Sequence, residues 1–300
     1  MNLLVTGAFN WTENEIENLR LLGHNVVFMQ QESSPLPCEA TWVEGVITNG
    51  LFLYHPIESF TSLRFIQLTS AGFDRVPLAY IQEKRIRLFN ARGVYSIPMA
   101  EFALCGVLLL YKQSDFFRDN QRKHKWLKNR KLLELYGKNV CIVGCGSVGN
   151  ECAKRFKSFG CNVVGVDIKP YQNDVYSKML SLDHLDTALS CADVTVLTLP
   201  LTKQTVHLIN SDRFAAMKPE SVLVNIARGA IVDTEAMIDA LKTKIIGAVI
   251  DVFEDEPLSD NSPLWDMDNA ILTPHNSFVG DGNHSRMLEV IYNNLKEVIL

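Results

Sequence analysis

The sequence predicts an α/β protein of two domains, each built on a doubly wound parallel sheet. Short apolar runs rich in β-branched residues alternate with helical segments along the chain, a pattern that favours parallel sheets covered by helices. A glycine-rich turn at residues 144–149 separates one such run from a helix. The length of 300 residues, 47% of them hydrophobic, is enough for two hydrophobic cores.

The first part of the chain predicts the smaller domain. Its expected strands are the apolar runs at residues 2–6, 25–29, 45–48, 64–68 and 86–89. Thr12 and Glu15 form a capping-box pattern that opens a helix, and Gly23 ends this helix. Turn residues follow two of the runs, at Asn49 and at 70–72. We expect ligand contacts there, because ligands bind at the carboxyl ends of parallel strands.

Three further segments predict helices. Residues 97–112 are almost wholly apolar, so this helix should be buried between domains or between subunits. The basic segment 118–131 is interpreted as a solvated helix face. The segment 281–300 should be an amphipathic helix that packs back on the body, with one apolar face formed by Met287, Leu288, Ile291, Leu295 and Val298.

Residues 138–167 form the most informative stretch. A strand at 140–143 leads into the glycine turn, a helix ending at Gly160, a second strand at 163–166 and then Asp167. In such a unit Gly144 makes the tight turn, Gly146 lets the backbone approach a pyrophosphate, and Gly149 packs the helix on the strand. Asp167 is placed to accept hydrogen bonds from an adenine ribose. The glycine pattern alone would also fit a turn without ligand, or a methyltransferase that binds S-adenosylmethionine.

Ionisable residues follow the later strands. Apolar runs at 193–199, 221–226, 247–250 and 270–272 complete a predicted sheet of about six parallel strands. Arg228, Glu256 and His275 come shortly after three of these runs. Taken singly, each has an ordinary structural interpretation: a surface ion pair, a solvated loop acid and a buried core histidine. A guanidinium at such a strand end would also form a planar fork for a carboxylate.

The composition narrows the possible partners and the compartment. The net charge of −5, with Lys and Arg scattered, gives no basic footprint for nucleic acid. The seven cysteines lack zinc-site spacing, so we expect no metal site and free thiols in a reducing compartment. The first residues run directly into a strand without a signal-peptide pattern, and residues 104–111 are too short to cross a membrane. These features predict a cytoplasmic protein.

Seven ordered segments resemble the D-isomer-specific 2-hydroxyacid dehydrogenases, over nearly the whole chain. They are residues 68–76, 89–104, 134–149, 192–210, 224–233, 247–258 and 272–277. A methyltransferase would explain only the glycine turn. The resemblance implies a Rossmann-type dinucleotide-binding domain at 95–275, inserted in a smaller flavodoxin-like substrate domain formed by 1–94 and 276–300. It also implies a cleft between the two domains.

The same resemblance implies a catalytic set of Arg228, Glu256 and His275. The family transfers a hydride between NAD(H) and a small 2-keto acid or D-2-hydroxy acid. Arg228 would hold the substrate carboxylate and polarise the ketone. His275 would donate a proton in reduction and accept one in oxidation. Glu256 would bond the far ring nitrogen, which fixes the tautomer and favours the imidazolium.

The resemblance also implies binding residues. Those for the cofactor are Gly144, Gly146, Ser147, Val148, Gly149, Asp167, Leu199, Pro200, Thr205, Ile226, Ala227 and Asp251, with Asp251 against the nicotinamide carboxamide. Those for the substrate are Arg228, the backbone of Ala71 and Gly72, and Tyr95. Tyr95 resembles the tyrosine of D-lactate dehydrogenase members that reaches the substrate, and a buried structural tyrosine is the alternative. Asn49 and Phe278 are weaker candidates for the pocket lining.

Some features depart from the family pattern or leave alternatives. The segment 273–277 differs from the common family ending, and Thr198 stands where many members have His. These departures leave the substrate side chain open. The long apolar helix predicts a homodimer interface. The alternative function is a non-enzymatic, NAD(H)-sensing corepressor-like protein of the same fold, and turnover of 2-keto acids would distinguish the two.

Overall fold

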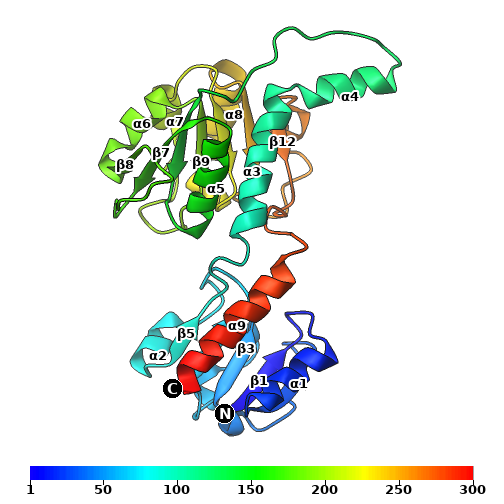
Figure 1. Ribbon diagram of the computed structural model, residues 1–300, viewed down its shortest axis with the longest axis vertical. Helices are drawn as coiled ribbons and strands as arrows, with labels where there is room; N and C mark the ends of the chain where they lie inside the picture. The colour runs from blue at the N-terminus through cyan, green and yellow to red at the C-terminus, as the bar shows by residue number, and fades with distance from the viewer. Residues whose placement is uncertain (300) are drawn as a thin grey trace. The chain divides into compact units, whose positions relative to one another are not determined.

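The computed structural model describes residues 1–299 and contains two compact units (Figure 1). One unit is formed by Met1–Tyr95 together with the segment from Gly280 onward, and the other by Ser96–Val279. Each unit is built on one sheet, of five and seven strands respectively, and every strand pair in both sheets is parallel. The predicted α/β fold with two parallel sheets is therefore confirmed. Within the described residues, no helix has both the length and the apolar character of a membrane span.

The five-stranded unit has the strand order β2-β1-β3-β4-β5. The strands are β1 (Asn2–Thr6), β2 (Asn25–Met29), β3 (Gly45–Thr48), β4 (Phe65–Leu68) and β5 (Arg87–Phe89). The helices are α1 (Glu13–Leu21), α2 (Leu78–Glu83) and α9 (Asn283–Ile299), with short 3-10 turns η1 (Ala40–Trp42), η2 (Leu51–Leu53) and η3 (Ile57–Ser59). Apolar residues of α1 and α9 pack with one face of the sheet, and α2 with the turns packs with the other.

Two sequence patterns explain the helices of this unit. The Thr12 hydroxyl accepts the Glu15 N–H at 3.3 Å, while the Glu15 carboxylate accepts the Thr12 N–H at 2.8 Å, so the predicted capping box is confirmed. Met287, Ile291 and Leu295 of α9 are buried against the sheet, which confirms the predicted amphipathic packing, whereas Leu288 of the predicted face is only partly buried. The side chain of Val298 lies outside the described residues.

The seven-stranded unit has the strand order β12-β11-β10-β9-β6-β7-β8. Its strands are β6 (Asn139–Val143), β7 (Asn162–Asp167), β8 (Lys178–Ser181), β9 (Val194–Leu197), β10 (Val222–Asn225), β11 (Gly247–Ile250) and β12 (Ala270–Leu272). Its helices are α3 (Ser96–Tyr111), α4 (Ser114–Arg122), α5 (Ser147–Ser158), α6 (Leu185–Cys191), α7 (Ser211–Ala216) and α8 (Thr234–Thr243), with 3-10 turns η4 (Leu182–His184), η5 (Gly229–Ile231) and η6 (Pro263–Asp266). Apolar residues of α3 and α5 pack on one face of the sheet, and those of α6, α7 and α8 on the other.

Two predictions for this unit need correction. The sheet has seven strands instead of about six, because β8 was missed. β8 is a four-residue edge strand that pairs with β7 alone, and none of its residues is fully buried, so it lacks the continuous apolar run of a central strand. The predicted helix face at 118–131 was also wrong, since α4 ends at Arg122 and His124 adopts a left-handed backbone conformation.

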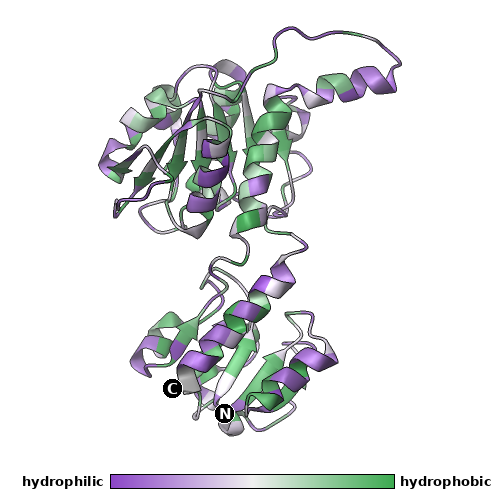
Figure 2. Ribbon diagram, viewed as in Figure 1, coloured by the Kyte–Doolittle hydropathy of each residue, from purple (hydrophilic) through white to green (hydrophobic). Residues whose placement is uncertain are grey.

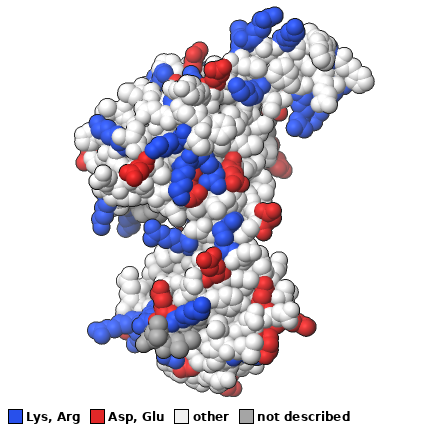
Figure 3. Space-filling view, in the orientation of Figure 1, with Lys and Arg blue, Asp and Glu red and all other residues white. Residues whose placement is uncertain are grey.

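The segment around α4 differs from the rest of its unit. In Figure 1, α4 and the chain after it extend away from the sheet, and Figure 3 shows Lys and Arg side chains gathered along them. The chain from 125 to 135 forms neither helix nor strand. Trp126 in this stretch is 94% exposed. We call residues 123–136 the extended arm.

The long apolar helix α3 is buried on one face only. It packs on α5, and a Cβ placed on Gly106 would lie 2.6 Å from the Val249 side chain, so only glycine allows this close approach to β11. Cys105 and Leu109 on another face are exposed. Figure 2 shows that α3 is hydrophobic along most of its length. In the single chain α3 is therefore covered on one face, and burial of the exposed face between subunits stays a prediction.

Candidate active site

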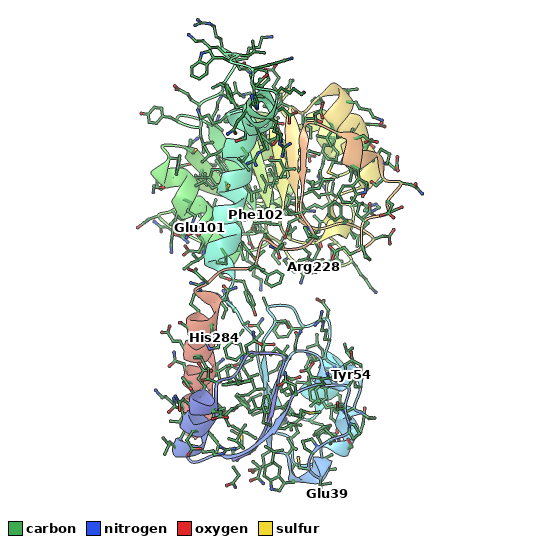
Figure 4. The ribbon with its side chains drawn as sticks, turned by 90° about the vertical axis from the view of Figure 1, so that its right-hand side faces the viewer. Glu39, Tyr54, Glu101, Phe102, Arg228 and His284 are labelled. Atoms are coloured by element: carbon green, nitrogen blue, oxygen red, sulfur yellow. The ribbon has the colours of Figure 1, made fainter. Side chains whose placement is uncertain are left out.

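The predicted site residues of the seven-stranded unit lie at one edge of its sheet. The glycine turn follows β6, Asp167 ends β7, and Leu199 comes shortly after β9. Arg228 follows β10, Asp251 follows β11, and His275 comes after β12. Because all these strands are parallel neighbours, their carboxyl ends share an edge. Figure 4 labels Arg228 at this edge.

The three glycines of the glycine turn have different surroundings. Gly144 has φ +94°, and a Cβ there would lie 2.7 Å from the Leu199 Cα. A Cβ on Gly149 would overlap the Gly144 carbonyl oxygen. In contrast, no described atom lies within 4 Å of a Cβ placed on the exposed Gly146. The first and third glycines are thus required by packing, whereas the second leaves an open cradle at the start of α5.

This cradle fits a dinucleotide cofactor. The first N–H groups of α5, from Ser147 onward, have no partners inside the helix and attract an anion such as a pyrophosphate. The Asp167 carboxylate accepts the N–H groups of Cys145 at 2.8 Å and Lys169 at 3.0 Å, and the side chain remains partly exposed for ribose hydroxyls. No cluster of metal-ligand side chains is present in the part of the chain that the structure describes.

The loop after β9 is closed by Thr205. Its buried hydroxyl donates to the Pro200 carbonyl at 2.8 Å and accepts the Thr202 N–H at 2.7 Å. Thr198 donates its hydroxyl to the Gly144 carbonyl, so this departure from the family pattern ties β9 to the glycine turn. Ile226 and Ala227, predicted to contact the cofactor, are buried at the end of β10. Direct cofactor contacts of these loops stay predictions.

Arg228 lies in the loop after β10, which is held by hydrogen bonds and packs closely on the loop after β11. The Asn225 side chain donates to the Arg228 carbonyl at 3.1 Å, and Arg228 Nη1 donates to the Ala227 carbonyl at 2.7 Å. A Cβ on Gly229 would overlap the backbone of Phe253, so only glycine permits the loops after β10 and β11 to touch. The position of the Arg228 backbone is therefore coupled to the segment that carries Glu256.

Glu256 and His275 form a direct pair. His275 Nδ1 lies 2.9 Å from Glu256 Oε2, and Glu256 Oε1 accepts the Phe253 N–H at 3.1 Å. Because a carboxylate can only accept, Nδ1 carries the proton of this bond and Nε2 is the ring atom left for proton exchange. The two side chains are 42% and 38% exposed, so the pair lies at the surface of its unit. The Phe278 ring stands edge-on to His275 at 6.2 Å.

Asp251 organises the loop that carries His275. Its side chain is fully buried, and its carboxylate accepts the Thr273 hydroxyl at 2.6 Å and the N–H groups of Asn276 at 2.7 Å and Ser277 at 3.0 Å. The Asp251 carbonyl accepts the His275 N–H at 2.8 Å. His275 has φ +52°, which is uncommon for a residue other than glycine. Sequence reasoning missed this supporting role, and the predicted nicotinamide contact stays a prediction.

The remaining predicted residues belong to the five-stranded unit. Ala71 and Gly72 follow β4, and Asn49 follows β3. The Glu32 carboxylate, which sequence reasoning missed, accepts the N–H groups of Asn49 and Gly50, both at 2.8 Å, and so orders the turn after β3. These residues lie at the carboxyl edge of the five-stranded sheet.

Tyr95 is hydrogen-bonded to a neighbouring loop in this structure. Its hydroxyl donates to the Thr69 carbonyl, and burial raises the pKa of the phenol. Its donor proton therefore holds the backbone after β4. A Tyr95 contact with substrate stays a prediction, and so does the alternative of a structural tyrosine.

Comparisons with known proteins agree with this geometry. The family profile described as D-isomer specific 2-hydroxyacid dehydrogenase, NAD binding domain, matches residues 104–277. A glyoxylate reductase of Thermofilum pendens is 34% identical over 252 residues, which are 81% of this chain and 74% of the relative. A D-3-phosphoglycerate dehydrogenase of Methanocaldococcus jannaschii is 35% identical over 73% of this chain and 42% of the relative.

Solved structures give the same result. The TT0316 protein of Thermus thermophilus has a TM-score of 0.79 and 32% identity, covering 100% of this chain and 97% of that one. The D-lactate dehydrogenase of Aquifex aeolicus, complexed with NAD and lactic acid, has a TM-score of 0.79 and 25% identity over 99% of this chain and 95% of that one. The methyltransferase alternative is thereby removed. The chain belongs to the D-isomer-specific 2-hydroxyacid dehydrogenase family, and it contains that family's NAD-binding domain.

Proposed function

We propose that the protein reduces a small 2-keto acid to the D-2-hydroxy acid with NADH, using Arg228, Glu256 and His275. The family is one of NAD-dependent oxidoreductases, and the substrate and the residue roles are our proposal. The observation that carries it is the Glu256 and His275 pair, 2.9 Å apart, at the same sheet edge as Arg228 and the glycine turn.

Each of the three side chains supplies a different part of the reaction. Bound NADH supplies the hydride. The Arg228 guanidinium binds the carboxylate of the keto acid and polarises its ketone through charge-assisted hydrogen bonds. His275 donates the proton from Nε2 to the developing alkoxide, and Glu256 orients the ring through Nδ1. Asp251 holds the loop in which His275 has its left-handed backbone conformation.

The substrate is expected to be a small keto acid. Glyoxylate is the first candidate, because several relatives at 30–34% identity are named glyoxylate reductases, and pyruvate is the second. We assign the five-stranded unit as the substrate domain, where the backbone of Ala71 and Gly72 binds the carboxylate. The seven-stranded unit is assigned as the dinucleotide domain, which the extent of the family match supports.

We also propose a cytoplasmic homodimer. The exposed Cys105 and Leu109 on α3 and the exposed Trp126 of the extended arm would be covered by a second copy. All seven cysteines are free thiols, which supports a reducing compartment. Sedimentation velocity tests the assembly: wild type should sediment as a dimer and Leu109→Asp as a monomer. A monomeric wild type would contradict the proposal.

The activity is tested with a panel of 2-keto acids of increasing side-chain size. Each is incubated with the protein and NADH, and oxidation is followed by the loss of the nicotinamide absorbance. We expect turnover to be fastest for the smallest acids and to yield the D product on chiral chromatography. Absence of turnover with every acid, with NADH binding retained, would contradict the proposal and favour the corepressor-like alternative.

A further inference from the structure

The loop after β4, residues 69–72, has an unusual hydrogen-bond pattern. Its four successive carbonyl groups all accept a hydrogen bond from the protein. The donors are the Tyr95 hydroxyl to Thr69, the Ala91 N–H to Ser70 at 2.9 Å, the Asn90 side-chain amide to Ala71 at 2.6 Å and the Ser70 hydroxyl to Gly72 at 3.0 Å. We call this segment the β4 loop. Its carbonyls are thus held by the fold.

The N–H groups of the β4 loop, unlike its carbonyl groups, are only partly hydrogen-bonded within the protein. Thr69 donates its N–H to the Thr48 carbonyl at 2.8 Å, which anchors the start of the loop to β3. Within residues 1–299, neither Ala71 nor Gly72 donates its N–H to another protein atom. Ala71 is exposed and Gly72 is partly exposed. Successive backbone N–H groups left open in this way form a binding position for an anionic oxygen.

Asn90 is the side chain that links this loop to the next strand. It lies directly after β5, donates through Nδ2 to the Ala71 carbonyl at 2.6 Å, and accepts the Arg92 N–H through Oδ1 at 3.2 Å. Its amide is therefore held at both ends. Rotation of the peptide between Ala71 and Gly72 would break the first bond, and this peptide contains the Gly72 N–H.

We propose that Asn90 is a positioning residue for recognition of the substrate carboxylate. By holding the Ala71 carbonyl, it fixes the orientation of the peptide whose N–H group binds the carboxylate. This inference rests on the proposed function, in which Ala71 and Gly72 bind the keto acid. Asn90 acts through the backbone and takes no part in hydride or proton transfer.

Three variants test this role. Asn90→Ala removes the donor, and Asn90→Asp keeps the shape but sets a carboxylate oxygen against the Ala71 carbonyl. Asn25→Ala is the matched control, because Asn25 also donates a side-chain hydrogen bond, to Asn2 at 2.9 Å, at the opposite end of the same sheet. Steady-state kinetics gives kcat and KM, and quenching of NADH fluorescence gives the affinity of the enzyme and NADH complex for oxamate, an unreactive pyruvate analogue.

We expect Asn90→Ala to raise KM for the keto acid and the dissociation constant of oxamate about tenfold, the effect of about one lost hydrogen bond. Asn90→Asp should raise both further. The kcat value and the dissociation constant of NADH should stay within about twofold of wild type, and Asn25→Ala should change none of these constants.

Two results would overturn the inference. The first is unchanged oxamate affinity in both Asn90 variants, and the second is an equal change in the Asn25 control. A wild type that binds oxamate in an Asn90-dependent way but turns over no keto acid would support the positioning role and reject the proposed activity. The two proposals therefore fail separately.

Discussion

The two units use the carboxyl edges of their parallel sheets in different ways. In the seven-stranded unit, the strand ends present reactive side chains, Arg228, Glu256 and His275, each supported by neighbouring loops. In the five-stranded unit, the β4 loop presents backbone N–H groups, and side chains such as Asn90 hold its carbonyls. We propose that the same architecture serves proton transfer in one unit and anion binding in the other. Changes at His275 and at Asn90 should therefore alter different kinetic constants.

The largest effect is expected for His275. His275→Ala removes the proton donor and should lower kcat about 10²- to 10⁴-fold, while NADH binding stays nearly intact because the glycine turn is unchanged. His184→Ala, which removes an exposed imidazole from the same unit, is the control. Stopped-flow kinetics with nucleotide titration gives both values. An active His275→Ala enzyme would exclude the assigned role.

Arg228 should show a smaller, geometry-dependent effect. Arg228→Lys keeps the charge but loses the planar fork, so it forfeits one charge-assisted hydrogen bond worth about 1.5–3 kcal/mol. This corresponds to a roughly ten- to hundredfold loss in kcat/KM, mainly as a raised KM for the keto acid. Arg228→Gln should lose nearly all activity. Unchanged constants in both variants would make Arg228 a purely structural residue.

Asp167 of the seven-stranded unit should determine which nicotinamide cofactor is preferred. Its carboxylate would repel a 2′-phosphate, so wild type should prefer NADH over NADPH. Asp167→Ala should lower kcat/KM for NADH roughly tenfold, because the hydrogen bonds to the ribose are lost. The preference for NADH over NADPH should therefore become smaller. The ratio of kcat/KM for the two nucleotides is the measurement, and Asp174→Ala at an exposed position is the control. Equal use of both nucleotides by wild type would contradict this assignment.

The smallest effect concerns the pair of His207 and Glu254, whose Nε2 and Oε2 atoms lie 2.7 Å apart. The hydrogen bond to Glu254 raises the pKa of His207. Burial alone would raise the pKa of Glu254, but bonds from Thr234 and His207 outweigh it and lower this pKa. The contribution of His207 to folding stability is complete below its unfolded pKa of about 6.5, and it is lost as the pH rises through the raised pKa of the folded state. The contribution of Glu254 is present above its unfolded pKa of about 4.3, and it is lost as the pH falls through the lowered pKa of the folded state.

Glu254→Gln tests this pair. The difference in melting temperature from wild type should be largest near about pH 5 to 6.5 and should shrink as the pH rises through the raised pKa of His207. It should be small, because both groups are partly exposed. Asp255→Asn, the adjacent exposed acid, serves as control. A difference that does not vary with pH would show that the charge on His207 plays no part.

Local patterns in the chain predicted much of the fold. Arg228, Glu256 and His275 stood out because they follow apolar runs, but only the family resemblance implied their catalytic roles, which stay predictions. The glycine turn could be found from its spacing between a strand and a helix, and packing requires glycine at Gly144 and Gly149. The bond from Asn90 to Ala71 spans 19 residues, and those around Asp251 span 22 to 26. Such contacts depend on strand neighbours and leave no local signal. β8 was missed for a related reason, since only its pairing with β7 makes it a strand.

We propose that His275 of the seven-stranded unit transfers the proton and that the β4 loop of the five-stranded unit binds the substrate carboxylate. The most direct test is to measure kcat and KM for His275→Ala and Asn90→Ala side by side, with the same keto acid at saturating NADH. We expect His275→Ala to lower kcat with little change in KM, and Asn90→Ala to raise KM with little change in kcat. If both variants changed the same constant by similar factors, this division of roles between His275 and the β4 loop would be contradicted.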